Sequence, residues 1–400
     1  MPSVGCSTLI TCAFPSLPAR SPADPEMVRD AVVAWDGPTL TYAGPRSGWP
    51  DPVDEELAGR TIIPGFVDCH THLPFFGWRD DEYEARLAGA SYRDLHGEGG
   101  IARSARMLAE ASDQEILEFC RPLAAEMLLH GTTALELKTG YGLSVESELR
   151  QARLARRLAE EIPQTATVTL LACHAVPDGM DRASWVEAVR TELIPTAARE
   201  GLADAVDVYV EDIAFTIRDL EAVAGAAAAV GLPLRVHADQ LGPSGAAEAA
   251  VRLGARSADH LNHVSEEGVA ALVAGETVAV LLPASTLMLR AQPPPADRLA
   301  RGASLALATD CNPGTSPVLS MPESVALGCA TYGLSPLEAL VAATANPAWV
   351  LGLHDRLGSL EPGRRADFVV LEGDQFRRVP YRPGHNPVIA TFVGGVPSDW

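Results

Sequence analysis

The feature that most constrains the fold is a regular alternation of short β-rich runs with longer helical segments, from residue 66 to about residue 354. Eight β-rich runs are separated by segments rich in Ala, Leu, Glu and Arg, an order typical of parallel βα architecture. Eight parallel strands close a TIM-type (β/α)8 barrel. The predicted strands are 66–72, 132–138, 168–174, 206–211, 234–239, 257–260, 278–282 and 304–310, and the clearest predicted helices are 147–161, 185–200, 218–229 and 246–253.

The two ends of the chain have a different character. Residues 1–65 mix short apolar runs with Pro and Gly, which predicts strands and turns but no long helix. Residues 357–400 return to turn and strand composition. We therefore predict an α/β protein with two parts: a small discontinuous β-sandwich domain formed by 1–65 and 357–400, and a barrel domain over 66–356.

The composition argues against membranes and nucleic acid as binding partners. A hydrophobic content of 47% with no apolar run of membrane-spanning length indicates a globular protein that does not cross a membrane. A net charge of −21 repels nucleic acid. Seven cysteines without an apolar leader favour a reducing compartment, so we expect a cytoplasmic protein. A homodimer is expected because closed symmetric dimers are the commonest oligomers.

Two histidines, His70 and His72, lie in the first predicted strand. Residues i and i+2 of a strand face the same side, so both imidazoles should point to the barrel axis. His237 and Asp310 follow at the ends of two later strands. Three neutral nitrogens and one carboxylate suit Zn²⁺ or Fe²⁺ with a position left for water, whose pKa such a metal lowers toward about 7. This set predicts a hydrolytic metal site.

Other polar residues also fall at predicted strand ends, among them His174, Gln240 and His260, together with Lys138, the only lysine of the chain. Arg79, seven residues past His72, can reach over the rim and bind a carboxylate with its guanidinium fork. The alternative for Arg79 is an exposed arginine in a charged run.

These motifs resemble the amidohydrolase superfamily. The run Pro-Gly-Phe-Val-Asp-Cys-His-Thr-His (64–72) is similar to the metal-binding opening of its barrel, and the tail 358–370 is similar to its returning β-domain. Within the superfamily the chain most resembles the imidazolonepropionase family. The motifs that carry this resemblance are Lys-Thr-Gly-Tyr-Gly-Leu (138–143), Cys-His-Ala-Val-Pro (173–177), Val-His-Ala-Asp-Gln (236–240), Ser-Ala-Asp-His-Leu (257–261) and Ala-Thr-Asp-Cys-Asn-Pro-Gly-Thr-Ser-Pro (308–317).

The resemblance implies hydrolysis of the cyclic amide C–N bond of 4-imidazolone-5-propionate to N-formimino-L-glutamate, a step of histidine degradation. It implies one divalent metal per chain, Zn²⁺ or Fe²⁺. Our hypothesis for the mechanism is that Asp310 accepts the proton of the attacking water and that His260 or His174 stabilises the oxyanion. The implied metal ligands are His70, His72, His237 and Asp310; the implied carboxylate-binding pair is Arg79 and Tyr92; the implied ring pocket is Tyr141, His174, Gln240, His260, Asn312, Gly314 and Thr315.

Three departures from the family pattern leave alternatives open. Glu98 leads the glycine-rich run, residues 75–78 are bulky and aromatic, and Gln240 stands where some relatives carry a glutamate that shuttles protons. The alternatives are a related mononuclear amidohydrolase or deaminase acting on another carboxylate-bearing heterocycle, a two-metal amidase, and a catalytically silent scaffold. Lys138 lies on the second predicted strand rather than the fourth, which favours one metal and a supporting ion pair for this lysine.

Overall fold

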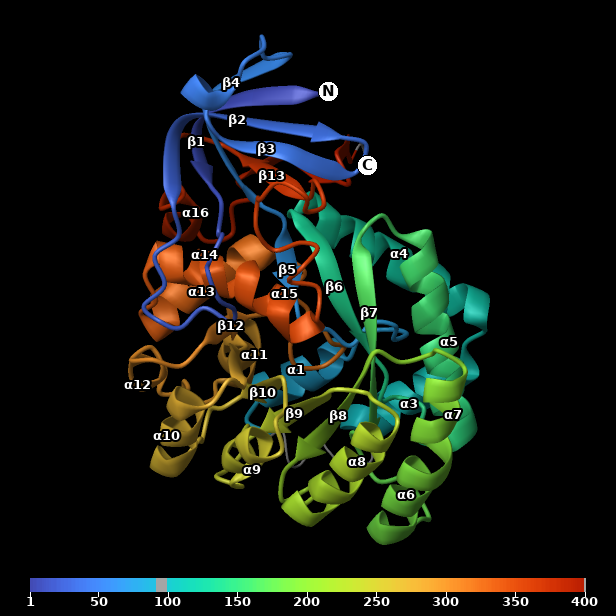
Figure 1. The fold of residues 1–400 in the computed structure, drawn as a ribbon. Helices are drawn as coiled ribbons and strands as arrows, with labels where there is room; N and C mark the ends of the chain where they lie inside the picture. The colour runs from blue at the N-terminus through green and yellow to red at the C-terminus, as the bar shows by residue number, and fades with distance from the viewer. Residues whose placement is uncertain (91–98, 399–400) are drawn as a thin grey trace.

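The computed structural model describes residues 1–90 and 99–398, which form two sheets and a layer of helices (Figure 1). The smaller sheet joins the two ends of the chain, in the order β15-β14-β13-β4-β1-β2-β3. This confirms the predicted discontinuous β-domain. Its strands are β1 (Ser3–Ile10), β2 (Met27–Asp36), β3 (Thr39–Pro45), β4 (Glu55–Pro64), β13 (Phe368–Leu371), β14 (Val388–Val393) and β15 (Val396–Pro397).

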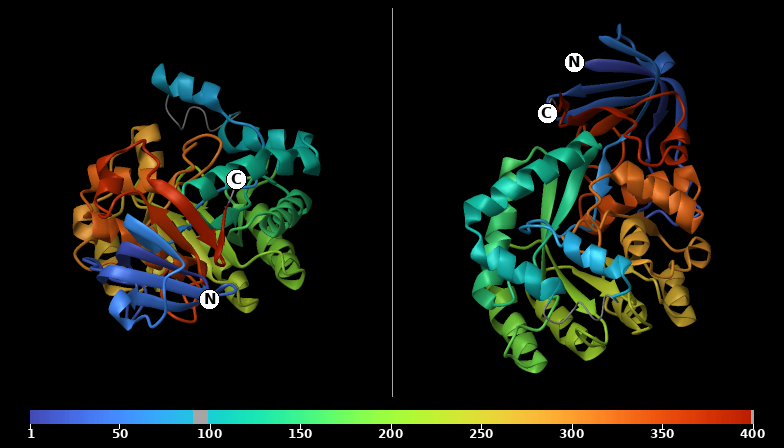
Figure 2. Two further views of the ribbon diagram at one scale, coloured as in Figure 1. Left: turned by 90° about the horizontal axis from the view of Figure 1, so that it is seen from above. Right: turned by 180° about the vertical axis from the view of Figure 1, so that it is seen from behind.

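Strands β5 to β12 form the second sheet, parallel throughout and in sequential order. Helices surround it in every view (Figure 2), so the predicted (β/α)8 barrel is confirmed. The strands are β5 (Phe66–Asp68), β6 (Thr132–Lys138), β7 (Thr165–Cys173), β8 (Ala205–Val210), β9 (Leu234–Ala238), β10 (Ser257–His260), β11 (Val278–Leu281) and β12 (Leu305–Leu307).

The barrel closes between its first and last strands, and both are shorter than predicted. The ladders of β5 and β12 end at Asp68 and Leu307. Beyond these ends, the N–H of Asp310 donates to the carbonyl of His70 (3.0 Å), and the N–H of His72 donates to the carbonyl of Cys311 (2.8 Å). The backbone of Asp310 turns there with φ = 55°. Where the histidines and Asp310 meet, the barrel is therefore closed by individual backbone hydrogen bonds instead of a regular strand ladder.

The helices follow the predicted pattern with one correction. The segment predicted as one helix over 185–200 is two helices, α6 and α7, joined by a π-helical turn (Val189–Leu193). Pro195 has no N–H to continue the α-helical ladder, which explains the wider turn. The α-helices are α1 (Asp80–Leu87), α3 (Gly100–Glu110), α4 (Asp113–Leu129), α5 (Val145–Glu161), α6 (Arg182–Ala188), α7 (Ile194–Arg199), α8 (Ile217–Ala229), α9 (Ala246–Arg252), α10 (Glu266–Ala274), α11 (Pro283–Leu289), α12 (Ala296–Leu299), α13 (Met321–Tyr332), α14 (Pro336–Ala342), α15 (Ala345–Leu351) and α16 (Arg378–Tyr381), with a short 3₁₀ turn at Arg46–Gly48.

The small sheet lies against the N-terminal ends of β5 and β6. The N–H of Gly65 donates to the carbonyl of Asp367 (3.1 Å), and Thr391 Oγ1 donates to the carbonyl of Leu128 (3.0 Å). The opposite, C-terminal end of the barrel is thus left to its loops. The segment between β1 and β2 also reaches the barrel, where the N–H of Ala19 donates to Asn346 Oδ1 (2.7 Å). The exact domain boundaries at 65/66 and 356/357 stay a prediction.

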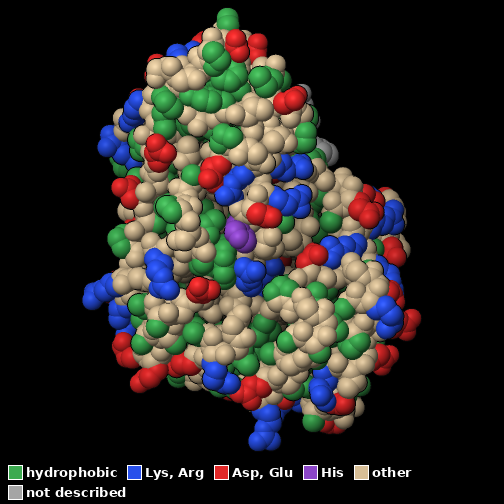
Figure 3. All heavy atoms as spheres, viewed as in Figure 1, with side chains coloured by type: hydrophobic (Ala, Val, Ile, Leu, Met, Phe, Trp, Pro, Cys, Tyr) green, Lys and Arg blue, Asp and Glu red, His purple; other side chains and the backbone are tan. Residues whose placement is uncertain are grey.

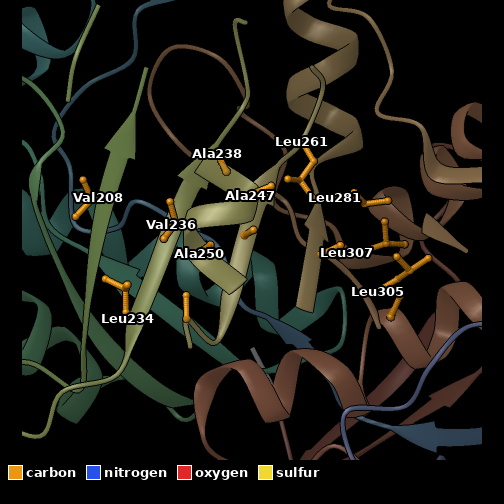
Figure 4. Close-up of a cluster of buried hydrophobic side chains, with 14 of the residues drawn as sticks. Val208, Leu234, Val236, Ala238, Ala247, Ala250, Leu261, Leu281, Leu305 and Leu307 are labelled. Atoms are coloured by element: carbon orange, nitrogen blue, oxygen red, sulfur yellow. The ribbon is translucent and has the colours of Figure 1, made fainter. Parts of the chain in front are cut away.

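Alternating side chains form the barrel core. Val236 and Ala238 of β9 pack in one apolar cluster with Ala247 and Ala250 of α9 (Figure 4). Each such fully buried Val or Leu stabilises the fold by about 1.5–3 kcal/mol. The residue between them, His237, must therefore face the barrel axis.

The surface is mixed in character. Acidic and basic side chains are interspersed over the face in Figure 3, and hydrophobic ones occur in small groups. Within residues 1–90 and 99–398, no helix combines the length and apolar character needed to cross a membrane.

Candidate active site

A pocket lies at the C-terminal ends of the barrel strands, the face on which barrel enzymes place their active sites. It brings together most of the site residues predicted from the sequence. The pocket is lined by His72, Arg79, Ile101, Tyr141, His174, Tyr209, His237, Gln240, His260, Asp310, Asn312 and Thr315.

The other predicted residues lie next to this pocket or outside the described chain. His70 has no exposed surface and lies beneath the pocket floor, and Gly314 packs against Arg79. Tyr92 lies outside the described residues, as does Glu98. Sequence reasoning missed Ile101 and Tyr209. Tyr209 could have been found, because it alternates with the helix-facing valines of strand β8.

His70 is the centre of the histidine cluster. Its ring centroid lies 4.4 Å from that of His237, 5.3 Å from that of His72 and 5.4 Å from that of His260. Asp310 Oδ1 lies 3.5 Å from His70 Nε2 and 3.3 Å from His72 Nε2. The cluster therefore unites residues from the first, fifth, sixth and eighth barrel strands.

Burial controls the protonation states of this cluster. Burial lowers the pKa of His70 well below its ordinary value, and the positive charge of Lys138 adds to that effect. Burial also lowers the pKa of His72, and it lowers that of His260 to about 3. For Asp310, contacts with His72 and nearby imidazoles outweigh burial, and its pKa is lowered. Neutral imidazoles with an ionised carboxylate are the forms that bind metals.

Unpaired buried atoms in the cluster fit a metal ion. Among the described residues, His70 Nε2, His237 Nε2 and Asp310 Oδ2 have no hydrogen-bond partner, although buried polar atoms are normally paired. In the part of the chain that the structure describes, three groups have all their ligand atoms within 4.8 Å of one another, and His70 belongs to two of them. These two groups are His70 with His72 and Asp310, and His70 with His237 and His260. The donor set suits zinc or iron. The assignment of the four ligands stays a prediction.

Two buried carboxylates lie behind the histidines, and sequence reasoning missed both. Asp259 Oδ2 lies 2.6 Å from His70 Nδ1. Asp207 Oδ2 lies 3.0 Å from His237 Nδ1, without the alignment of a good hydrogen bond. Acidic partners of this kind fix the tautomer and the ring orientation of metal-binding histidines. Lys138 in turn contacts Asp207 Oδ2 at 2.6 Å, so the predicted supporting ion pair of this lysine is present.

Helix α5 shapes the loop that carries Tyr141. Glu148 Oε1 accepts hydrogen bonds from the N–H groups of Gly142 (2.7 Å) and Leu143 (3.1 Å). Gln151 Oε1 accepts one from the N–H of Tyr141 (3.0 Å). Gly140 needs its φ of 119°, and a side chain there would collide with His174. The loop that carries Tyr141 is thus anchored to α5 by these hydrogen bonds.

Arg79 is a buried residue rather than a surface arginine. Its side chain is 2% exposed, and its Nε lies 3.3 Å from Glu82 Oε2. One terminal nitrogen donates to the carbonyl of Gly100 and to Ser104 Oγ. A Cβ at Gly314 would overlap the guanidinium, so a larger residue there would have to displace the Arg79 side chain. The guanidinium is therefore held in the pocket wall as a fixed cation.

Asn312 organises the loop after the last strand. Its Oδ1 accepts hydrogen bonds from the N–H groups of Gly314 (2.9 Å) and Thr315 (2.7 Å), and its Nδ2 donates to the carbonyl of Asp310 (2.6 Å). These bonds use much of the capacity of the amide. Asn312 therefore shapes the pocket wall next to Asp310.

The barrel, its discontinuous β-domain and the His/Asp cluster on the C-terminal rim define the amidohydrolase class of protein, and the model of the Amidohydrolase family matches residues 61–398. The imidazolonepropionase of Rhizorhabdus wittichii is 43% identical over 370 residues, which cover 90% of this chain and 93% of that protein. The imidazolonepropionase of Paracoccus denitrificans is 40% identical over 378 residues, covering 92% and 94%. The chain belongs to the imidazolonepropionase family.

Solved structures share the fold. Guanine deaminase of E. coli superposes with a TM-score of 0.71 at 17% identity, covering 100% of this chain and 99% of the deaminase. An adenosine deaminase from Xanthomonas campestris with bound zinc superposes with a TM-score of 0.68 at 19% identity, covering 99% and 92%. At this level of identity the likeness extends to the fold alone.

Proposed function

We propose that the chain hydrolyses the cyclic amide C–N bond of 4-imidazolone-5-propionate and releases N-formimino-L-glutamate, as a step of histidine degradation. One observation carries this proposal: the buried guanidinium of Arg79 lies in the wall of the same pocket as the His/Asp cluster. A fixed cation beside a hydrolytic centre suits a small ring with a carboxylate arm. The name shared by the relatives supports the same substrate.

The residues divide into those for metal and those for substrate. We assign His70, His72, His237 and Asp310 to one divalent metal, Zn²⁺ or Fe²⁺. When bound, such a metal lowers the pKa of water and polarises a carbonyl. Arg79 binds the propionate carboxylate.

Proton transfer and oxyanion stabilisation fall to three side chains. The carboxylate of Asp310, whose Oδ2 has no partner among the described residues, accepts the proton of the attacking water. The proton then passes to the ring nitrogen as the C–N bond breaks. His260, whose low pKa keeps it neutral, or His174 donates a hydrogen bond to the developing oxyanion.

The pocket wall holds the ring. Tyr141 and Asn312 flank it, with Thr315 beside Asn312. Gly314 leaves room for Arg79, and Tyr92 is proposed to share the carboxylate contact. Gln240 orients the ring by hydrogen bonding but cannot carry a proton.

Two other functions remain as alternatives from the sequence. A deaminase of a related heterocycle would need a proton shuttle to the leaving ammonia, and Gln240 cannot supply one. A silent scaffold would be expected to have lost a metal ligand, whereas all four predicted ligands lie together near the pocket. Both observations favour the imidazolone hydrolase.

The test is turnover of freshly made 4-imidazolone-5-propionate, followed by its ultraviolet absorbance. Wild type should consume it rapidly, and Arg79→Ala should raise KM by about 10–100-fold, which corresponds to the roughly 1.5–3 kcal/mol of a charged hydrogen-bonded contact. Arg153→Ala, on the outer surface of α5, is the matched control. Absence of turnover by protein with one metal per chain would refute this substrate.

We also propose a cytoplasmic homodimer that binds neither membranes nor nucleic acid. All seven cysteines are free, which supports a reducing compartment. The net charge of −21 opposes binding to nucleic acid. The mass of the particle in solution would test the dimer.

A further inference from the structure

The only lysine of the chain lies inside the barrel. The Lys138 side chain has no exposed surface, and its Nζ lies 2.6 Å from Asp207 Oδ2, 2.9 Å from Glu136 Oε2 and 3.9 Å from Asp259 Oδ2. Such charges interact strongly because little water screens them, and a buried charge without a partner is costly. The ammonium therefore belongs to a fixed interior network.

The same carboxylate oxygens reach the histidines. Asp259 Oδ2 lies 2.6 Å from His70 Nδ1, and Asp207 Oδ2 lies 3.0 Å from His237 Nδ1. Asp207 Oδ1 also accepts a hydrogen bond from the backbone N–H of His237 (3.2 Å). A carboxylate hydrogen-bonded to Nδ1, as Asp259 is to His70, holds the proton there and leaves Nε2 free as a ligand, whereas Asp207 holds His237 through the backbone hydrogen bond and the close contact at Nδ1. Both Nε2 atoms are without a hydrogen-bond partner among the described residues.

We propose that Lys138 is a positioning residue of the active site, whose ammonium holds Asp207 and Asp259 in the orientation that directs His237 and His70 toward the metal. The inference rests on the metal site of the proposed function. Asp207, His237 and Asp259 also form a group with all ligand atoms within 4.8 Å, and Lys138 Nζ lies 2.6 Å from Asp207 Oδ2 and 3.9 Å from Asp259 Oδ2. Without Lys138, the carboxylates of Asp207 and Asp259 would face each other behind the histidines with no ammonium between them.

Metal affinity measured without substrate tests the proposal. Lys138→Met keeps an unbranched side chain, one heavy atom shorter than that of lysine, and removes its charge. Arg235→Met is the matched control, since Arg235 is the other cation of this interior network but pairs with Glu136 and Thr169 instead. Chelator competition with Zn²⁺ should show a dissociation constant raised about 10–100-fold in Lys138→Met, the usual effect of losing an outer partner of a ligand, and a change below about threefold in the control.

Two results would overturn the proposal: an unchanged Zn²⁺ affinity in Lys138→Met, or equal losses in both variants, which would indicate a general effect on the barrel. If Lys138→Met does not fold, wild type decides the question. Protein labelled with isotopic lysine has a single side-chain ammonium signal, because Lys138 is the only lysine. That signal should shift on addition of one equivalent of Zn²⁺, and an unmoved signal would refute the coupling.

The proposed function can fail separately. Wild type that binds Zn²⁺ but does not open the imidazolone ring would refute the substrate, while the affinity loss in Lys138→Met would still support the positioning role.

Discussion

Glu211, at the C-terminal edge of strand β8, makes protein stability depend on pH. Its side chain is 3% exposed, and its Oε1 accepts a hydrogen bond from the N–H of Leu241 (2.8 Å), in the loop that begins at Gln240. Burial raises the pKa of Glu211 from 4.5 to about 7, because the backbone hydrogen bonds offset it only in part and Asp239 repels the charge. The folded protein therefore holds this proton more tightly than the unfolded chain does.

The sign of the effect follows from this difference in proton binding. The stability contributed by protonated Glu211 is fully present below about pH 4.5 and is lost as the pH rises through about 7. A pKa change of that size corresponds to about 3 kcal/mol, which water in the open pocket beside Glu211 and Asp212 reduces to roughly 1–2 kcal/mol. Glu211→Gln retains an oxygen for Leu241 and cannot ionise. Relative to wild type, the variant should thus gain roughly 1–2 kcal/mol between about pH 5 and pH 8.

Urea unfolding of both proteins across this pH range, with metal content held equal, measures the difference. Glu221→Gln on the exposed face of α8 is the control, and its difference from wild type should change little with pH. A difference between Glu211→Gln and wild type that stays constant with pH, or that moves in favour of wild type as the pH rises, would refute the reasoning.

Three further predictions concern catalysis. Asp310→Asn should lower kcat by about 10²–10⁴-fold, the usual contribution of a positioned base, while mass spectrometry still finds metal; near-normal turnover would exclude Asp310 as the base. Glu148→Ala removes the carboxylate that anchors Gly142, so KM should rise about tenfold, for a loss of about 1.4 kcal/mol in binding, with less effect on kcat in steady-state assays. Chelation should abolish turnover and lower the thermal midpoint, and added Zn²⁺ or Fe²⁺ should restore both; an active metal-free protein would contradict metal dependence.

The sequence predicts the bounds of those strands whose ends are determined by neighbouring residues. The ranges 132–138 and 257–260 coincide with β6 and β10, because apolar alternation and the flanking turns define both ends. The ends of β5 and β12 could not be predicted, since closure of the barrel depends on two segments about 240 residues apart, as in the hydrogen bond between Asp310 and His70.

The same distinction applies to the site. His70 and His72 could be predicted because two histidines at positions i and i+2 of a strand face the same side and can share a metal. Asp207 and Asp259 could not, since each is a single acidic residue whose meaning depends on its neighbours across the sheet. The strand register places Asp259 beside His237, a relation that no local window contains.

Charges of opposite sign alternate along the barrel axis below the site. Arg235 pairs with Glu136, Glu136 with Lys138, and Lys138 with Asp207, which contacts His237 at the rim. Each buried charge is therefore compensated by the next, and removing one member leaves its neighbour uncompensated at a cost of about 3–5 kcal/mol. The orientation of His237 thus depends on Lys138, which lies deeper in the barrel and acts through Asp207. A relative could keep the His-x-His motif and still lose its metal through a change at Lys138.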